Sequence, residues 1–245
     1  MSPALEPGWT LVAAAGVCGV AGFMRGFVGV GSGMLMAPVF AILYGPLETV
    51  GMIILLELAV TAQLLPSVHR AIQWPVIVPM GVAAALCMPL GTWLLVSVDA
   101  ELMARLIALV VLVLVLVLLS GWRFRGEKRL ATTIAVGSTS GVLMAATSLG
   151  NPPVMLYLLS SPDSAATNRA NFTGYFALTL VTLLAMMLIR ELIAVHTALR
   201  VLVLLPVFAL AAWAGARFFN RSGDRLYRRA ALGLLLCVAI FGLVR

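Results

Sequence analysis

The chain has 245 residues, of which 62% are hydrophobic and 10% are charged, and its formal net charge is +7. About a quarter of the residues are charged in soluble domains, so this composition excludes an ordinary soluble protein and indicates lipid as the main solvent. The basic residues lie between hydrophobic stretches, which favours a cytoplasmic membrane face over a surface that binds nucleic acid. Many charge-free stretches reach the roughly 20 residues that cross a hydrocarbon core, and they lack the alternation of barrel strands. We therefore expect an all-α polytopic membrane protein.

Apolar runs between Pro, Gly and charged residues predict the helices in chain order. The first ten residues carry Glu6 and no basic region, so we expect no cleavable signal peptide and a first helix that stays in the protein. Two shorter apolar pieces cannot cross a core of about 30 Å and are predicted to be broken or re-entrant half-helices, at 33–44 and 152–160. About eight full transmembrane helices are predicted, at 9–28, 47–66, 74–97, 102–121, 130–148, 168–189, 198–218 and 228–244.

The first half-helix follows the segment Gly29-Val30-Gly31-Ser32-Gly33. Glycines at 19, 22, 26, 29 and 33 would form a smooth packing stripe on a continuous helix. We favour a helix break instead, because this density of glycine costs about 1 kcal/mol per residue relative to alanine.

The uncharged stretch 130–162 is too long for one span, and the segment Gly150-Asn151-Pro152-Pro153 predicts a second break within it. If both breaks form, the N-termini of two half-helices meet near the midplane and present unpaired N–H groups, which suit an anion. Side chains of Ser and Thr near the breaks, together with Asn151, add further donors. The predicted substrate-binding residues are Arg25, Gly31, Ser32, Gly33, Thr147, Ser148, Gly150, Asn151, Pro152 and Pro153.

Arg25 and Glu57 are the charges placed deepest within the predicted helices. For Arg25, snorkelling to the cytoplasmic face and the attraction or binding of an anion are both open. Glu57 lies about ten residues from either end of its span, so snorkelling is harder there. We favour a proton or cation site at Glu57 over a structural pair with Arg25, and we assign it to ion coupling.

The two halves of the chain share a pattern that predicts an internal duplication. It divides the chain into a first transmembrane repeat at 1–122, a basic cytoplasmic linker at 123–129 and a second transmembrane repeat at 130–245. Each half has an odd number of crossings, so the two repeats should be inverted relative to each other. Positions that match under a shift of 115 or 124 residues are Gly22 with Gly137, Gly26 with Gly141, Pro38 with Pro153, Gly91 with Gly215 and Arg105 with Arg229.

This topology gathers most basic residues on one face, which is cytoplasmic by the positive-inside rule, and leaves both termini outside. The residues on that face are Arg70, Arg123, Arg125, Lys128, Arg129, Arg169, Arg217, Arg221, Arg225, Arg228 and Arg229.

Neither the cysteines nor the short motifs of the chain indicate chemistry. Cys18, Cys87 and Cys237 lie singly in apolar runs, and we interpret them as small packing residues. The chain has no nucleophile and base pair, metal-ligand cluster or nucleotide-binding signature. We therefore expect no enzyme, no cofactor and no metal.

Three motifs carry a family resemblance: Gly22-Phe23-x-x-Gly26-x-x-Gly29-x-Gly31-Ser32-Gly33 with Pro38, Val68-His69-Arg70 before Trp74, and Gly137-x-x-x-Gly141 leading to Gly150-Asn151-Pro152-Pro153. Together they resemble the TauE/SafE sulfite exporter family, also called the TSUP permeases, across nearly the whole chain. The resemblance implies transport of sulfite, a sulfonate or another small sulfur-containing oxyanion across a bacterial inner membrane, in either direction.

A secondary transporter that works by alternating access is the first hypothesis. Its expected partners are a small anionic substrate, a coupling proton or sodium ion and the lipid bilayer, with a homodimer as one option and no nucleic acid. An anion channel or a non-transporting membrane subunit of a larger complex are the alternatives.

Overall fold

The computed structural model describes residues 8–98, 129–147, 151–159, 161, 163–221 and 233. The predicted helices at 102–121 and 228–244 and nearly all of the linker at 123–129 lie outside the described residues. The described segments are helical, with α1 (Gly8–Val28), α2 (Ser32–Tyr44), α3 (Pro46–Val68), the 3-10 helix η1 (His69–Ala71), α4 (Trp74–Ser97), α6 (Leu130–Thr147), α7 (Asn151–Leu159), α8 (Ala165–Ile189) and α9 (Val195–Phe219).

The lengths of these helices confirm a polytopic helical membrane protein. Five of them, α1, α3, α4, α8 and α9, are long and apolar enough to cross a membrane. Helix α8 begins at Ala165, before the predicted 168, because the Ser164 hydroxyl caps it and accepts a hydrogen bond from the Thr167 backbone N–H at 3.1 Å.

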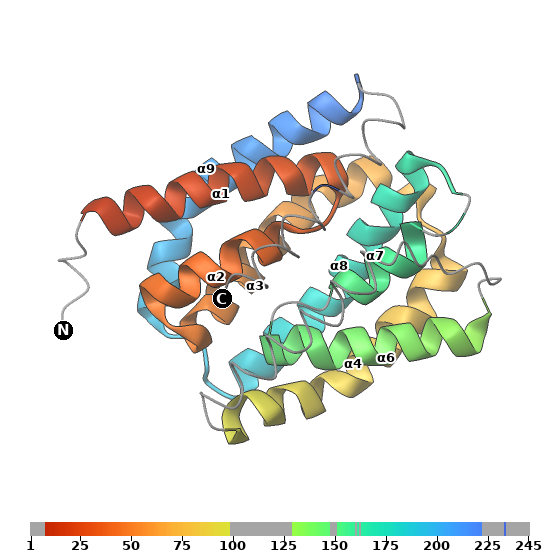
Figure 1. Ribbon diagram of the computed structural model, residues 1–245, viewed down its shortest axis with the longest axis horizontal. Helices are drawn as coiled ribbons and strands as arrows, with labels where there is room; N and C mark the ends of the chain where they lie inside the picture. Colours follow the sequence, from red (N-terminus) through yellow and green to blue (C-terminus); the bar gives the residue numbers. More distant parts are fainter. Residues whose placement is uncertain are drawn as a thin grey trace.

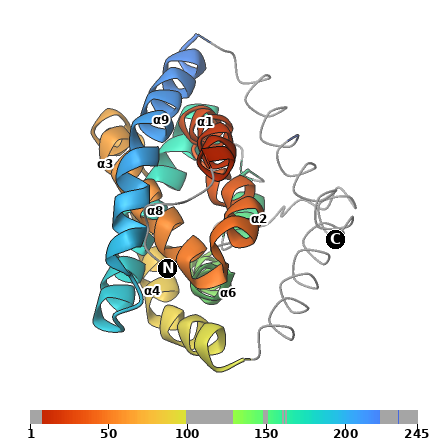
Figure 2. The same ribbon diagram turned by 90° about the vertical axis from the view of Figure 1, so that its left-hand side faces the viewer.

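The helices pack in pairs that repeat across the bundle. Helix α1 lies along α9 at one edge and α4 lies along α6 at the opposite edge, with α2, α3, α7 and α8 between them (Figure 1). In the turned view, α3, α8 and α9 follow one side of the bundle and α1, α2 and α6 the other (Figure 2). The main helix contacts fall into matching pairs when α1, α2, α3 and α4 are exchanged with α6, α7, α8 and α9, in that order. The contact of α1 with α9 then corresponds to that of α6 with α4, the contact of α3 with α9 to that of α8 with α4, and the contact of α1 with α2 to that of α6 with α7.

Glycines let the two edge pairs approach closely. A Cβ at Gly22 or Gly26 would meet the backbone carbonyl oxygen of Phe208 or Ala212 on α9. In the same way, a Cβ at Gly137 or Gly141 would meet the carbonyl oxygens of Met80 and Ala84 on α4. The early part of the predicted glycine stripe therefore serves close helix packing, as the first of the two interpretations expected.

Two apolar clusters form the core. One joins α1, α2, α3 and α9 around side chains such as Phe40 and Phe208, and the other includes Met80, Met155 and Phe172 from α4, α7 and α8. Helices α1 and α3 contribute to both clusters, and they are the helices that carry Arg25 and Glu57.

Candidate functional site

The first predicted helix break is present between α1 and α2. Helix α1 ends at Val28, and Gly29 and Gly31 adopt positive φ angles of +89° and +99° before α2 begins at Ser32. These φ values are favourable for glycine alone, so the later part of the glycine pattern serves the break. Both interpretations of the glycines hold, each for its own segment.

Arg25 and Glu57 form a buried ion pair beside this break. The Arg25 Nε donates to Glu57 Oε2 at 2.7 Å, and the two residues are 0% and 2% exposed. The other guanidinium nitrogens donate to the Thr61 hydroxyl at 2.8 Å and to the Gly29 carbonyl at 2.6 Å. Snorkelling is therefore wrong for Arg25, whose side chain is directed into the protein.

The charged side chains at the break lie beside helix ends of opposite dipole sign. Two carbonyls at the C-terminal end of α1 are hydrogen-bonded by arginines, since Arg169 Nε donates to Gly26 O at 2.9 Å and Arg25 donates to Gly29 O. At the other end of the break, the hydroxyl of Ser32, the first residue of α2, donates to Glu57 Oε1. Cations thus lie at a negative helix end and an anion at a positive one, which stabilises both dipoles. In this conformation the N-terminus of α2 already has a carboxylate beside it.

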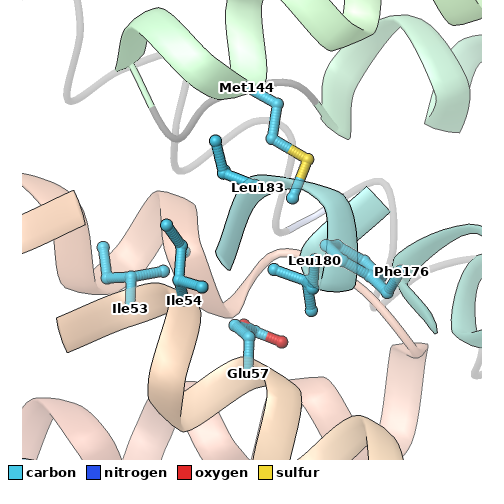
Figure 3. Close-up of a pocket in the computed structure, with 8 residues that line it drawn as sticks. Ile53, Ile54, Glu57, Met144, Phe176, Leu180 and Leu183 are labelled. Carbon is cyan, nitrogen blue, oxygen red and sulfur yellow. The ribbon is translucent and has the colours of Figure 1, made fainter. Parts of the chain in front are cut away.

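A small pocket opens next to Glu57, between α2 and α3 on one side and α6 and α8 on the other. Glu57 from α3 faces side chains of α8, and Met144 from α6 covers the far side (Figure 3). Among the described residues, Glu57 is the single ionisable group in the lining. The pocket is lined by Gly33, Ile53, Ile54, Glu57, Met144, Phe176, Leu180 and Leu183.

A comparison with known protein families places nearly the whole chain. A family model described as "Sulfite exporter TauE/SafE" matches residues 13–242, almost the whole chain. The chain belongs to the TauE/SafE family. No curated protein and no solved structure matches it.

Family membership confirms the resemblance seen in the sequence and makes the chain a multi-pass transmembrane protein of the anion-transporter type. A transporter family is also consistent with the expectation that the chain is not an enzyme. The described residues contain no group of three or more His, Cys, Asp or Glu side chains able to hold a metal ion.

The TauE/SafE chain brings the predicted site residues of its first half together. Arg25 and Ser32 each donate a hydrogen bond to Glu57, Gly31 precedes the first residue of α2, and Gly33 lines the pocket.

In the second half, α6 ends at Thr147 and α7 begins at Asn151, so Asn151, Pro152 and Pro153 occupy the first turn of the second short helix. Ser148 and Gly150 lie outside the described residues. Their assignment to the substrate site, like that of the first-half residues, remains a prediction.

Three residues of the site were missed by the sequence analysis. Thr61 lies one helical turn after Glu57, and this spacing was a usable signal. Phe176 places its ring 4.6 Å from the Arg25 guanidinium carbon, a cation–π contact that no local pattern indicates. Arg169, counted with the charges of the cytoplasmic face, is only 6% exposed and packs on the break.

A buried neutral pair links two helices in the second half of this TauE/SafE protein. Shifts of 115 and 118 residues place Arg25 on Ser140 and Glu57 on Tyr175. The Tyr175 hydroxyl donates to Ser140 Oγ at 2.8 Å, which joins α6 to α8 as the ion pair joins α1 to α3. The shift of 118 also aligns Thr61 with Thr179. Of these two contacts, the one between α1 and α3 is charged and the one between α6 and α8 is neutral.

Proposed function

We propose that this TauE/SafE protein is a secondary transporter that moves a small sulfur-containing oxyanion, sulfite or an organosulfonate, across the bacterial inner membrane by alternating access. The observation that carries the proposal is the buried Arg25–Glu57 pair at a helix break, beside a pocket lined by α2, α3, α6 and α8. A buried charge pair in a membrane protein is costly and marks a functional site more often than a structural one.

Substrate binding then takes the form of a competition for Arg25. The guanidinium and the first turn of α2 offer donors to an anion, and Glu57 accepts hydrogen bonds from two of them, Arg25 Nε and the Ser32 hydroxyl. An incoming oxyanion replaces the Glu57 carboxylate at these donors, because a buried anion needs hydrogen bonds in place of its hydration. Release of Glu57 from Arg25 is favoured when Glu57 takes up a proton.

A proton suits this site better than a sodium ion as the coupling ion. A sodium ion at Glu57 would lie next to the Arg25 guanidinium, whose Nε is 2.7 Å from the carboxylate, and the two cations would repel each other. Protonation removes the charge on Glu57 without adding a second cation. Glu57 is therefore assigned to proton coupling.

Alternating access is assigned to movement of two inverted repeats, 1–122 and 130–245, against each other. The exchange of α1–α4 with α6–α9 that leaves the contacts unchanged supports a repeat, as do the matched glycine contacts at both edges. The pocket lies where α3 meets α8, which is the contact that the exchange maps onto itself.

Flux measurements on purified protein in liposomes test this function. We expect saturable flux of sulfite or a small sulfonate that is accelerated by a pH gradient. Flux that increases linearly with concentration would favour the channel, and a protein that neither binds nor moves any anion would favour the non-transporting subunit.

A further inference from the structure

Two polar contacts connect the first and second halves of the chain, one at each end of the helix pair α3 and α8. We propose that these contacts are the two gates of the transport cycle, and that each opens while the other stays closed. We call them the Glu48 gate and the Asp163 gate. The proposal rests on the proposed function, since it names the side chains whose contacts alternating access has to break.

The Glu48 gate joins the first turn of α3 to the first two turns of α9. Arg200 Nη1 donates to Glu48 Oε1, and His196 Nε2 lies 3.5 Å from Glu48 Oε2. The Thr197 hydroxyl also donates to Glu48 Oε1, at 3.4 Å, and the Arg200 guanidinium carbon lies 4.7 Å from the centre of the Tyr44 ring. Glu48 and Arg200 are 16% and 23% exposed, so this ion pair is better shielded from water than an ordinary surface pair.

The Asp163 gate joins the residue before α4 to α8 and the segment before it. Gln73 Nε2 donates to Asp163 Oδ1 at 3.1 Å, and the Ser161 hydroxyl donates to Asp163 Oδ2 at 2.7 Å. Asn171, which is buried in α8, accepts from the Gln73 backbone N–H at 2.8 Å and donates to Gln73 Oε1 at 3.0 Å. Both the backbone and the side chain of Gln73 are therefore held by the second half of the chain.

The two gates occupy matching positions in the two halves. The shifts of 115 and 124 residues that align the halves place Glu48 on Asp163 and Gln73 on Thr197. Helix α3 begins at the Glu48 gate and ends just before the Asp163 gate, and α8 runs in the opposite direction between the same two gates. The gates therefore close opposite ends of the contact between α3 and α8, and Glu57 and its pocket lie between them.

Both gates are closed in the structure, and Leu180, which lines the pocket between them, is only 1% exposed. Access to the pocket from one side requires α3 and α8 to separate at that end, which breaks the gate there. Alternating access requires the other gate to stay closed meanwhile. Loss of one gate removes a contact that the closed form has and the open form lacks, so it shifts the population toward the form open on that side.

A single cysteine at position 180 tests the proposal. Leu180→Cys in an otherwise Cys-free protein is labelled with a membrane-impermeant methanethiosulfonate, from outside in intact cells and from the cytoplasmic face in inside-out vesicles. The predicted topology places the Glu48 gate outside and the Asp163 gate in the cytoplasm. Glu48→Gln should raise the labelling rate from outside by about fivefold or more and lower it from the cytoplasm, and Gln73→Ala should do the reverse.

Two further variants separate gating from a loss of charge or of fold. Arg190→Gln is the matched control, because it removes an exposed charge at the same end of α8 as the Glu48 gate, and it should leave labelling unchanged from both sides. Arg200→Gln should act like Glu48→Gln, and the double variant should add little, because both side chains belong to one contact. A partly unfolded protein would be labelled faster from both sides, unlike one with a single open gate.

Anion flux through the wild-type protein in liposomes distinguishes failure of the gates from failure of the proposed function. If the wild type moves sulfite or a small sulfonate, and Glu48→Gln and Gln73→Ala change labelling on neither side or equally on both, the gates are overturned and the transporter proposal stands. If the wild type moves neither anion, both proposals are overturned.

Discussion

At the scale of single residues, the Arg25–Glu57 pair is the contact that an anion is proposed to open. Removal of one member of a buried ion pair costs about 3–5 kcal/mol, because the remaining charge is left without a partner. In the proposed mechanism an external anion supplies the missing charge. The same side chains therefore contribute to stability and respond to ligand.

Glu57→Gln separates these two roles, because it keeps the size of the side chain and removes its charge and its proton. We expect the variant to bind sulfite or a small sulfonate and to lose the acceleration of transport by a pH gradient. Since Arg25 is then unpaired without ligand, the anion should raise its melting temperature more than that of the wild type. Binding, thermal unfolding in detergent and liposome uptake measure the three effects.

Normal uptake with intact pH dependence in Glu57→Gln would make Glu57 a structural partner of Arg25 and nothing more. Gln63→Glu would not serve as a control for Glu57→Gln, because Gln63 is exposed and Glu57 is buried. Thr61→Val is the informative neighbour, because it removes one hydrogen bond to Arg25 and leaves the Glu57 carboxyl group in place.

At the scale of helices, the break between α1 and α2 depends on backbone angles that other residues rarely adopt. Gly31 has a φ of +99° next to the site, and Gly45 has a φ of +86° between α2 and α3. Alanine at either position should destabilise the fold by about 1–3 kcal/mol.

Gly31→Ala should in addition weaken anion binding by about tenfold, since about 1.4 kcal/mol of distortion at the site has that effect. Gly45→Ala is the matched control, because its φ is equally strained and it lies away from the pocket. Isothermal titration calorimetry measures the anion affinity of both variants, and equal losses of affinity in the two would mean that the break does not shape the site.

Close packing of α1 on α9 gives a second test at this scale. Gly26→Ala places a methyl group against the Ala212 backbone carbonyl, so we expect a loss of about 1–3 kcal/mol in stability. Gly16→Ala on the same helix meets no atom within 4 Å and should be neutral or slightly stabilising. Thermal unfolding of the two variants compares them, and an unchanged melting temperature for Gly26→Ala would contradict the observed packing.

The helices were predictable from sequence because lipid requires long apolar runs with internal backbone hydrogen bonds. The break at Gly29 and Gly31 was predictable because glycine density is a local signal. The contacts of Arg25 with Glu57 and Phe176 were not, since they join α1 to α3 and α8, and a sequence carries no distance between helices. The buried place of Arg169 was missed for the same reason.

At the scale of the whole molecule, the proposed inversion of the two repeats fixes which loops face the same side. Loops 98–101 and 122–129 should lie on opposite sides of the membrane, with 122–129 and 217–229 in the cytoplasm. Single cysteines in these loops of a Cys-free variant, labelled with a membrane-impermeant maleimide in intact cells, measure this. Labelling of 98–101 and 122–129 from the same side would rule out the inverted arrangement.

The neutral balance of the Arg25–Glu57 site also bears on how membrane voltage acts on transport. One elementary charge that crosses the membrane couples to the voltage by about 2.3 kcal/mol per 100 mV. The structure has one cation and one carboxylate at this site, and the proposed transport step places the same cation, a monovalent anion and a protonated Glu57 there, so neither form carries net charge. A potassium diffusion potential set with valinomycin should therefore leave the uptake rate within about twofold, while a pH gradient changes it strongly. A substrate-evoked current on a supported membrane would show the opposite, that charge accompanies each anion. An electroneutral cycle leaves the direction of transport to the concentration gradients of the anion and the proton, so that one protein can export or import the anion as those gradients change.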